Sequence, residues 1–291
     1  MTVSIVGTGR VARGLGRRLR ELGWNVGAVT GRSLSSARAA VRAIGAGQAF
    51  SAPSPTILNS KVILIATPDA TVAEVAKNLS EIGGSSWQGK IVLHTSGSLD
   101  TSVLKPLADL GAATGSMHPI QTFSEQNMPE LSKVIFGIEG APAAVQVARK
   151  MIRQMDGVAV RLSGTNKAAY HAAGLFACVF ILALMEAGTR LLMSQGFKRR
   201  QALRALLPLA RQTLDNLESV GPHAAWTGPL SRGDFSTVER HTKALASGDA
   251  ELLEPYEALS RLTARLLSSQ SGAMLKQLEG IFAAAAISKH R

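Results

Sequence analysis

Two histidines and one lysine stand where their side chains could donate or accept a proton. His118 precedes Pro119 at the end of an apolar run, and Lys167 and His171 are four residues apart on one face of an expected helix. Imidazole and ammonium groups can protonate or polarise a carbonyl or an imine. We therefore take His118, Lys167 and His171 as candidate catalytic residues. The alternatives are an exposed loop histidine, a salt-bridged lysine and a packed histidine.

A glycine-rich segment near the N-terminus has the spacing of a phosphate-binding turn. The pattern G-x-G-x-x-A is formed by Gly7, Thr8, Gly9, Arg10, Val11 and Ala12. It follows an apolar run at residues 3–6 and opens an amphipathic stretch, so backbone N–H groups and the positive end of a helix would face a pyrophosphate. We expect Gly7 to Val11 to bind a dinucleotide. An ordinary tight turn is the alternative.

The residues after the next apolar run favour one dinucleotide over the other. A protein that prefers NAD places an acidic residue there, about 20 residues beyond the glycines, to bind the ribose hydroxyls. The chain instead has Arg32 followed by Ser33, with no acidic residue nearby. A guanidinium can bind a phosphate through two hydrogen bonds, and a serine hydroxyl can donate beside it. We therefore expect NADP as the cofactor; the alternative is that Arg32 only begins a surface helix.

Polar segments follow the later apolar runs, and ligands of an open α/β sheet bind at the carboxyl ends of its strands. The expected cofactor site further includes Thr67, Pro68, Thr95 and Ser96. Asp69 is expected first as a helix cap. A turn-rich loop further along carries an arginine that could bind a carboxylate or phosphate, or pair with the nearby acid. The expected substrate-binding residues are Ser96, Thr227, Arg232 and Asp234.

Apolar runs and helical periodicity alternate over the first 160 residues. The runs are 3–6, 26–29, 62–66, 91–93, 113–117, 134–138 and 158–162. Helical patterns fill most of the intervals, including 34–44, 69–82 and 142–155. Short, continuously apolar strands that alternate with helices predict a doubly wound parallel sheet, buried on both faces.

After residue 164 the strand pattern disappears. The expected helices are 166–194, 198–219, 236–247, 250–270 and 272–287. We therefore expect two domains, an α/β domain over residues 1–162 that binds the dinucleotide and an all-α domain over residues 163–291 for substrate binding and dimerisation. The stretch 172–185 is apolar nearly all round, so other helices or a second subunit must cover it.

Composition limits the class of protein and its partners. With 46% hydrophobic and 18% charged residues, the chain is expected to be globular. One cysteine, Cys178, excludes an internal disulfide framework, and together with the absence of a basic leader it favours the cytoplasm. The net charge of +12 is compatible with nucleic acid, but only 4% of residues are aromatic and no basic tail is present. We expect a small-molecule substrate, and neither metal, nucleic acid nor membrane.

The motifs occur together in one family. They are Gly7–Ala12, Ala66–Asp69, His94–Gly97, His118–Phe123, Phe136–Gly140, Tyr170–Ala173 and Thr227–Asp234. In these the chain resembles the Rossmann-like oxidoreductases that carry a helical C-terminal domain of unknown function, distant relatives of pyrroline-5-carboxylate reductase, ketopantoate reductase and the β-hydroxyacid dehydrogenases. The lysine motif of the last group, G-x-x-x-K-x-x-x-N, is altered here, because His171 stands in place of the asparagine.

The resemblance implies an NADP-binding Rossmann domain, a helical C-terminal domain that often dimerises, and an active site in the cleft between them. The function expected from the sequence is an NADP-dependent oxidoreductase that transfers a hydride to or from a small carbonyl, hydroxyl or imine compound. A non-catalytic NADP-binding or sensing protein is the alternative, because this fold hosts many functions. The helical domain is expected to form a homodimer.

Overall fold

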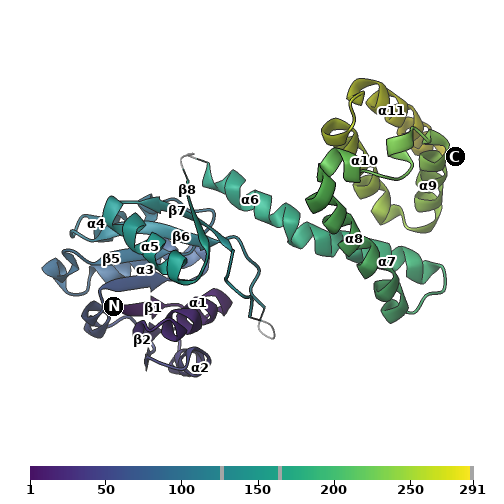
Figure 1. Cartoon of the computed structure of the whole chain (residues 1–291). Helices are drawn as coiled ribbons and strands as arrows, with labels where there is room; N and C mark the ends of the chain where they lie inside the picture. Colours follow the sequence, from purple (N-terminus) through teal and green to yellow (C-terminus); the bar gives the residue numbers. More distant parts are fainter. Residues whose placement is uncertain (125–127, 163–165, 289–291) are drawn as a thin grey trace. The chain divides into compact units, whose positions relative to one another are not determined.

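A mostly parallel sheet organises the N-terminal half of the protein (Figure 1). The structure is a computed structural model that describes residues 1–124, 128–162 and 166–288. Within these residues the sheet has eight strands in the order β3-β2-β1-β4-β5-β6-β7-β8. The strands are β1 Thr2–Val6, β2 Asn25–Thr30, β3 Gln48–Phe50, β4 Val62–Ile65, β5 Ile91–His94, β6 Ala113–Pro119, β7 Ile135–Gly140 and β8 Val158–Arg161. The predicted fold class is confirmed.

Two hydrophobic cores cover the two faces of the sheet. The helices of this half are α1 Arg10–Glu21, α2 Leu34–Ile44, α3 Asp69–Ser80, α4 Lys105–Ala108 and α5 Pro142–Gln154. Leu64 of β4 packs with residues of α1, α2 and α5, while its neighbours Ile63 and Ile65 pack with residues of α3 and α4. Successive strand side chains point to opposite faces, so a strand buried on both faces must be apolar at every position. The continuous apolar runs of the sequence follow from this requirement.

Helices make up the C-terminal half. They are α6 Lys167–Ala177, α7 Val179–Ser194, α8 Arg199–Ala225, α9 Phe235–Gly248, α10 Leu253–Leu267 and α11 Ser271–Ser288. A small core of α9, α10 and α11 includes Val238, Ala264 and Phe282. The predicted helices are present, but the one expected over 166–194 is broken at Cys178, whose backbone has φ −124° and ψ −77°.

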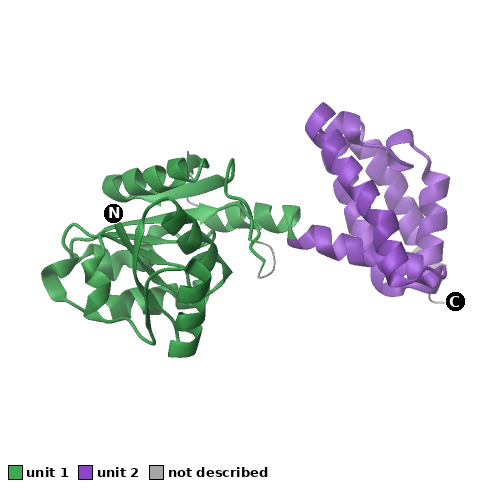
Figure 2. Cartoon of the chain, turned by 60° about the horizontal axis from the view of Figure 1, so that its bottom comes forward, with its two compact units in different colours: residues 1–178 green, residues 179–291 purple. Residues whose placement is uncertain are grey.

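The chain divides into two compact units, residues 1–178 and 179–291, which Figure 2 colours separately. The first unit therefore contains α6 as well as the sheet. This matters for the site, because α6 carries Lys167 and His171. The functional boundary expected between residues 162 and 163 stays a prediction.

One stretch, Lys167–Ser194, has the length and apolar composition that a membrane span requires. Two features of the structure do not suit such a span. Its backbone leaves the helical conformation at Cys178, and Lys167 at its beginning is hydrogen-bonded inside the first unit. In hydrocarbon every backbone polar group has to be satisfied within the protein.

Candidate active site

The candidate catalytic residues meet at the carboxyl ends of β5 and β6, inside the first unit. His118 lies near the end of β6, and α6 brings Lys167 and His171 to it from about 50 residues further along the chain. This is the edge at which ligands of an open α/β sheet bind. The structure thus brings together the three residues that the sequence predicts as catalytic.

His118 is held between two rings of α6. Its Nδ1 lies 2.9 Å from the hydroxyl of Tyr170, and the two ring centroids are 5.5 Å apart in an edge-to-face arrangement. The centroid of the His171 ring lies 5.8 Å from that of His118, again edge to face. Because Tyr170 and His171 are consecutive residues, one turn of α6 fixes both contacts.

The environment of His118 keeps its imidazole neutral. Burial lowers the pKa of His118 to about 4, and the neighbouring His171 and Lys167 lower it in the same direction. Asp69, at the first position of α3, opposes the shift. At pH 7 His118 therefore has one N–H donor and one acceptor nitrogen rather than two donors.

Lys167 is buried among acceptors, with 3% of its side chain exposed. Its Nζ donates to Ser116 Oγ at 2.9 Å and to the carbonyl of Ser96 at 3.3 Å, and it forms an ion pair with Glu139 at 3.3 Å. Burial lowers the pKa of Lys167, while the charge of Glu139 raises it. Through these two hydrogen bonds and one ion pair, Lys167 connects α6 to β6, to β7 and to the loop after β5.

Two glycines make room for the cluster. A Cβ atom on Gly97 would lie 2.7 Å from His118 Nε2 and 2.7 Å from His171 Cδ2. A Cβ atom on Gly137, which pairs with His118 across β6 and β7, would lie 2.5 Å from the Tyr170 hydroxyl. All three distances are shorter than the contacts that Cβ atoms make in proteins, so the rings reach these positions only because both residues lack a side chain.

The loop after β5 is held by its own polar groups. Ser96 Oγ accepts hydrogen bonds from the backbone N–H groups of Ser98 and Leu99, and the Ser96 N–H donates to His94 Nδ1. His94 is fully buried, and this burial lowers its pKa to about 4. The hydroxyl of Ser98 donates to Asp69 Oδ2. The helix cap predicted at Asp69 is wrong: Pro68 occupies the N-cap position of α3, and the Asp69 carboxylate accepts a hydrogen bond from the next loop instead.

The glycine-rich turn has the form of a phosphate cradle. Gly7 has φ +126°, and a Cβ atom there would lie 2.2 Å from the carbonyl oxygen of Ala66, so only glycine fits between β1 and β4. Gly9 is the N-cap of α1 and has no side-chain cap, and a Cβ atom on it would meet nothing within 4 Å. Open space therefore lies in front of Gly9, at the helix end whose N–H groups attract anions.

The loop predicted to select the cofactor lies beside this glycine-rich turn. A Cβ atom on Gly31 would lie 2.7 Å from Thr8 Cγ2, which places the end of β2 against the glycine-rich turn. Arg32 is exposed next to it. Ser33 is the N-cap of α2, where its Oγ accepts a hydrogen bond from the N–H of Ser36. An exposed guanidinium, serine hydroxyls and the start of a helix are together suited to a phosphate.

The other predicted ligand contacts are distributed over both units. In the first unit, Gly7 packs against the strand end that leads to Thr67 and Pro68, and the N–H of Thr95 donates to the carbonyl of Ile65. Arg10 is exposed and Val11 half-buried at the start of α1. Their contacts with a cofactor stay predictions.

Thr227, Arg232 and Asp234 belong to the second unit. Asp234 is the N-cap of α9 and accepts hydrogen bonds from Thr237 and Ser236, which lower its pKa to about 2. Thr227 and Arg232 are exposed. The structural role of Asp234 is a helix cap, and substrate binding by these three residues stays a prediction.

Sequence reasoning assigned no role to Tyr170 or Glu139. Both residues lie within motifs of the chain. Their positions in the sequence, however, do not indicate that Tyr170 contacts His118 or that Glu139 contacts Lys167. Glu139 faces Ser116, and Gly137 faces His118, only because β6 and β7 pair in an antiparallel register. The sequence had predicted parallel strands throughout, and this pair is the exception among the described strands.

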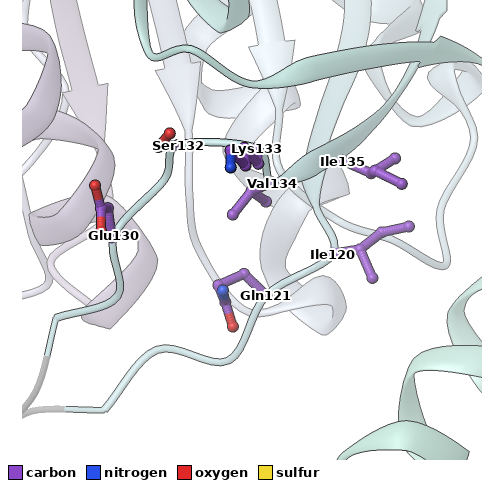
Figure 3. A pocket seen from close by; sticks show the side chains of 7 residues that line it. All are labelled: Ile120, Gln121, Glu130, Ser132, Lys133, Val134 and Ile135. Carbon is purple, nitrogen blue, oxygen red and sulfur yellow. The ribbon is translucent and has the colours of Figure 1, made fainter. Parts of the chain in front are cut away.

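A shallow pocket lies apart from this cluster, beside the connection between β6 and β7 (Figure 3). It is lined by Ile120, Gln121, Glu130, Ser132, Lys133, Val134 and Ile135. None of the predicted site residues lines it. We assign it no function.

Two family descriptions match the chain and together span most of it. Residues 1–119 match the Rossmann-like domain, and residues 134–263 match a domain of unknown function, DUF2520. The resemblance inferred from the motifs is confirmed. None of the curated proteins matches the chain.

Solved structures share the fold over nearly the whole chain. A candidate NADP oxidoreductase from Bacteroides fragilis is 22% identical, with a TM-score of 0.74 over 90% of this chain and 96% of that one. The reductive aminase from Aspergillus terreus, solved with NADPH and ethyl-5-oxohexanoate, is 16% identical, with a TM-score of 0.61 over 99% and 94%. Pyrroline-5-carboxylate reductase from Coxiella burnetii is 16% identical, with a TM-score of 0.56 over 98% and 97%. At these low identities, the structural similarity establishes a common fold and no common activity.

Proposed function

We propose that this chain, in which a Rossmann-like domain precedes a DUF2520 domain, is an NADP(H)-dependent oxidoreductase that acts on a small carbonyl, hydroxyl or imine compound. The observation that carries the proposal is the cradle at Gly7 and Gly9, with Arg32 beside it. Two neighbours of the same fold support it, because the reductive aminase was solved with NADPH and a Plasmodium falciparum pyrroline carboxylate reductase with NADP bound.

The residues of the chain fit the cofactor. Gly7, Thr8, Gly9, Arg10 and Val11 would hold its pyrophosphate at the start of α1, and Arg32 with Ser33 would hold the 2′-phosphate. Thr67, Pro68, Thr95 and Ser96, which follow β4 and β5, would lie along the rest of it. When bound, the nicotinamide supplies or accepts the hydride.

The chain's own residues would manage the proton and the charge. His118, neutral at pH 7, offers a single N–H donor, and His171 offers a second imidazole beside it. Lys167 would donate hydrogen bonds to Ser116 and Ser96 and pair with the charge of Glu139, so it would position the loop after β5 and add positive charge. We therefore assign the proton to the histidines and positioning to Lys167.

Calorimetry of Arg32→Asp tests the choice of cofactor. Loss of the charge-assisted contacts and added repulsion should weaken NADP binding by about 2–3 kcal/mol, or roughly 30- to 150-fold, and NAD binding far less. Arg42→Asp is the matched control, because it makes the same charge change in the last turn of α2, roughly 12 Å along the helix from its first residue. Equal losses for both cofactors, or a wild type that prefers NAD, would contradict the proposal.

Oxidation of NADPH by a panel of small carbonyl and imine compounds separates an enzyme from a sensor. An oxidoreductase should turn over members of the panel, whereas a sensing protein should bind NADP and turn over none. The cofactor measurement and the turnover measurement therefore test the two parts of the proposed function separately.

We further propose that the second unit forms a homodimer. Large apolar side chains on α7 and α8 are about half exposed or more. They are Val179 53%, Leu182 68%, Leu184 49%, Leu209 65%, Leu214 51% and Val220 58%. Large apolar side chains exposed in this number on two neighbouring helices favour an interface, and a symmetric dimer is the most common way to cover one. We further propose that the dimer acts on a small-molecule substrate in the cytoplasm. Neither nucleic acid nor a membrane is part of the proposal.

A further inference from the structure

We infer that Tyr170 is a positioning residue that fixes His118 in the tautomer with its proton on Nε2. The hydroxyl of Tyr170 would donate to Nδ1, so Nδ1 would be the acceptor of the ring. The inference deepens the proposed function, because it adds a residue to the same site. Its test requires neither cofactor nor substrate.

The contact is built by three separate segments. Tyr170 comes from α6, His118 from β6, and Gly137 from the neighbouring strand β7. The hydroxyl oxygen lies 2.9 Å from His118 Nδ1, a normal hydrogen-bond length. Gly137 is required, because a Cβ atom there would lie 2.5 Å from that oxygen. The hydroxyl is therefore enclosed on one side by backbone and on the other by the imidazole.

The direction of the hydrogen bond follows from the acidity of the two groups. A neutral imidazole has one N–H and one acceptor nitrogen, so either the phenol or Nδ1 carries the shared proton. Burial raises the pKa of Tyr170 and lowers the pKa of His118 to about 4, so both groups are neutral at pH 7. A neutral phenol is a stronger acid than a neutral imidazole N–H, and therefore the better donor.

The consequence lies on the other side of the ring. With Nδ1 occupied, the N–H of His118 is at Nε2, which faces Gly97 in the loop after β5. His171 Cδ2 reaches the same point. His118 would thus present a neutral hydrogen-bond donor of fixed direction, which can polarise a carbonyl or an imine without giving up a whole proton. His171 would then be the residue that transfers the proton.

Long-range proton–nitrogen NMR of the full chain with ¹⁵N-labelled histidine tests the inference at pH 7. Such spectra distinguish a protonated ring nitrogen from an unprotonated one, and His118→Gln identifies the signals of His118. In the wild type, Nδ1 of His118 should be unprotonated and Nε2 protonated. In Tyr170→Phe, which removes only the hydroxyl, both nitrogens should shift toward the average of the two tautomers.

The chain supplies its own control pair. His241 Nδ1 lies 3.0 Å from the hydroxyl of Tyr256, with the rings 5.9 Å apart and edge to face, but in the second unit. Tyr256→Phe should change the signals of His241 and leave those of His118 in place. A protonated Nδ1 on His118 in the wild type would overturn the inference, and so would His118 signals that are unchanged in Tyr170→Phe. The wild-type spectrum decides the first point even if a variant fails to fold.

Discussion

Lys167→Met is expected to destabilise the first unit strongly. Methionine retains most of the length of the lysine but has no charge. The change leaves Glu139 without its ionic partner, and its buried Oε1 accepts no hydrogen bond from the described residues that could replace that partner. It also removes the donor to Ser116 Oγ and to the Ser96 carbonyl, both of them buried residues.

The magnitude follows from the burial of the pair. Removing one partner of a buried ion pair costs about 3–5 kcal/mol, because an uncompensated charge remains. The side chain of Glu139 is 17% exposed, so water relieves part of this cost. We therefore expect a loss of about 3 kcal/mol in the free energy of unfolding at pH 7. That is a factor of more than 100 in the folding equilibrium.

Urea unfolding measures the effect, with tryptophan fluorescence to follow the first unit through Trp24 and Trp87, which are buried there. Adding Glu139→Gln to Lys167→Met should recover part of the loss, because the stranded charge is removed. Lys105→Met breaks an exposed pair with Asp109 and should cost less than about 1 kcal/mol. The reasoning fails if Lys167→Met costs no more than this control, or if the double variant loses the sum of the single losses.

Two further predictions concern assembly and pH. Light scattering at micromolar concentration should give twice the 30.5 kDa chain mass, and Leu182→Glu should shift the protein toward monomer; a wild-type monomer would contradict the dimer. Stability should fall as the pH drops from 7 to 4. Unfolded histidines bind protons near pH 6.5, whereas His94 and His118 bind them near pH 4, so the unfolded state takes up protons first. For the fully buried His94 alone, the loss in the free energy of unfolding between pH 7 and pH 4 approaches about 3 kcal/mol. A free energy of unfolding in urea that does not change with pH would refute this prediction.

The sequence by itself determined most of the elements and the place of the glycine-rich turn, because both depend on local rules. The short strand β3, Gln48–Phe50, was not predicted, because three partly exposed residues carry no apolar run. The helix predicted over 34–44 is present with those bounds, since its apolar period and its serine N-cap lie within the segment itself. Gly7 was singled out by its place in the G-x-G-x-x-A pattern, whereas its positive φ and its close approach to the carbonyl of Ala66 come from the structure. The sequence also predicted the candidate catalytic residues His118, Lys167 and His171. Their residue types, and their places at the end of a strand or the start of a helix, are local features as well.

Only the tertiary structure decided which partners these residues have. Lys167 meets Glu139, and His118 meets Tyr170, because β7 pairs antiparallel to β6 and α6 brings Lys167 and Tyr170 to these strands. The hydrophobic pattern of β6 or of β7 alone does not predict how the two strands pair, since pairing depends on contacts between residues distant in sequence. The burial of His118 is also decided by the tertiary structure. The low pKa of His118 arises from desolvation by the packed elements around it, and an isolated His-Pro segment carries no sign of it.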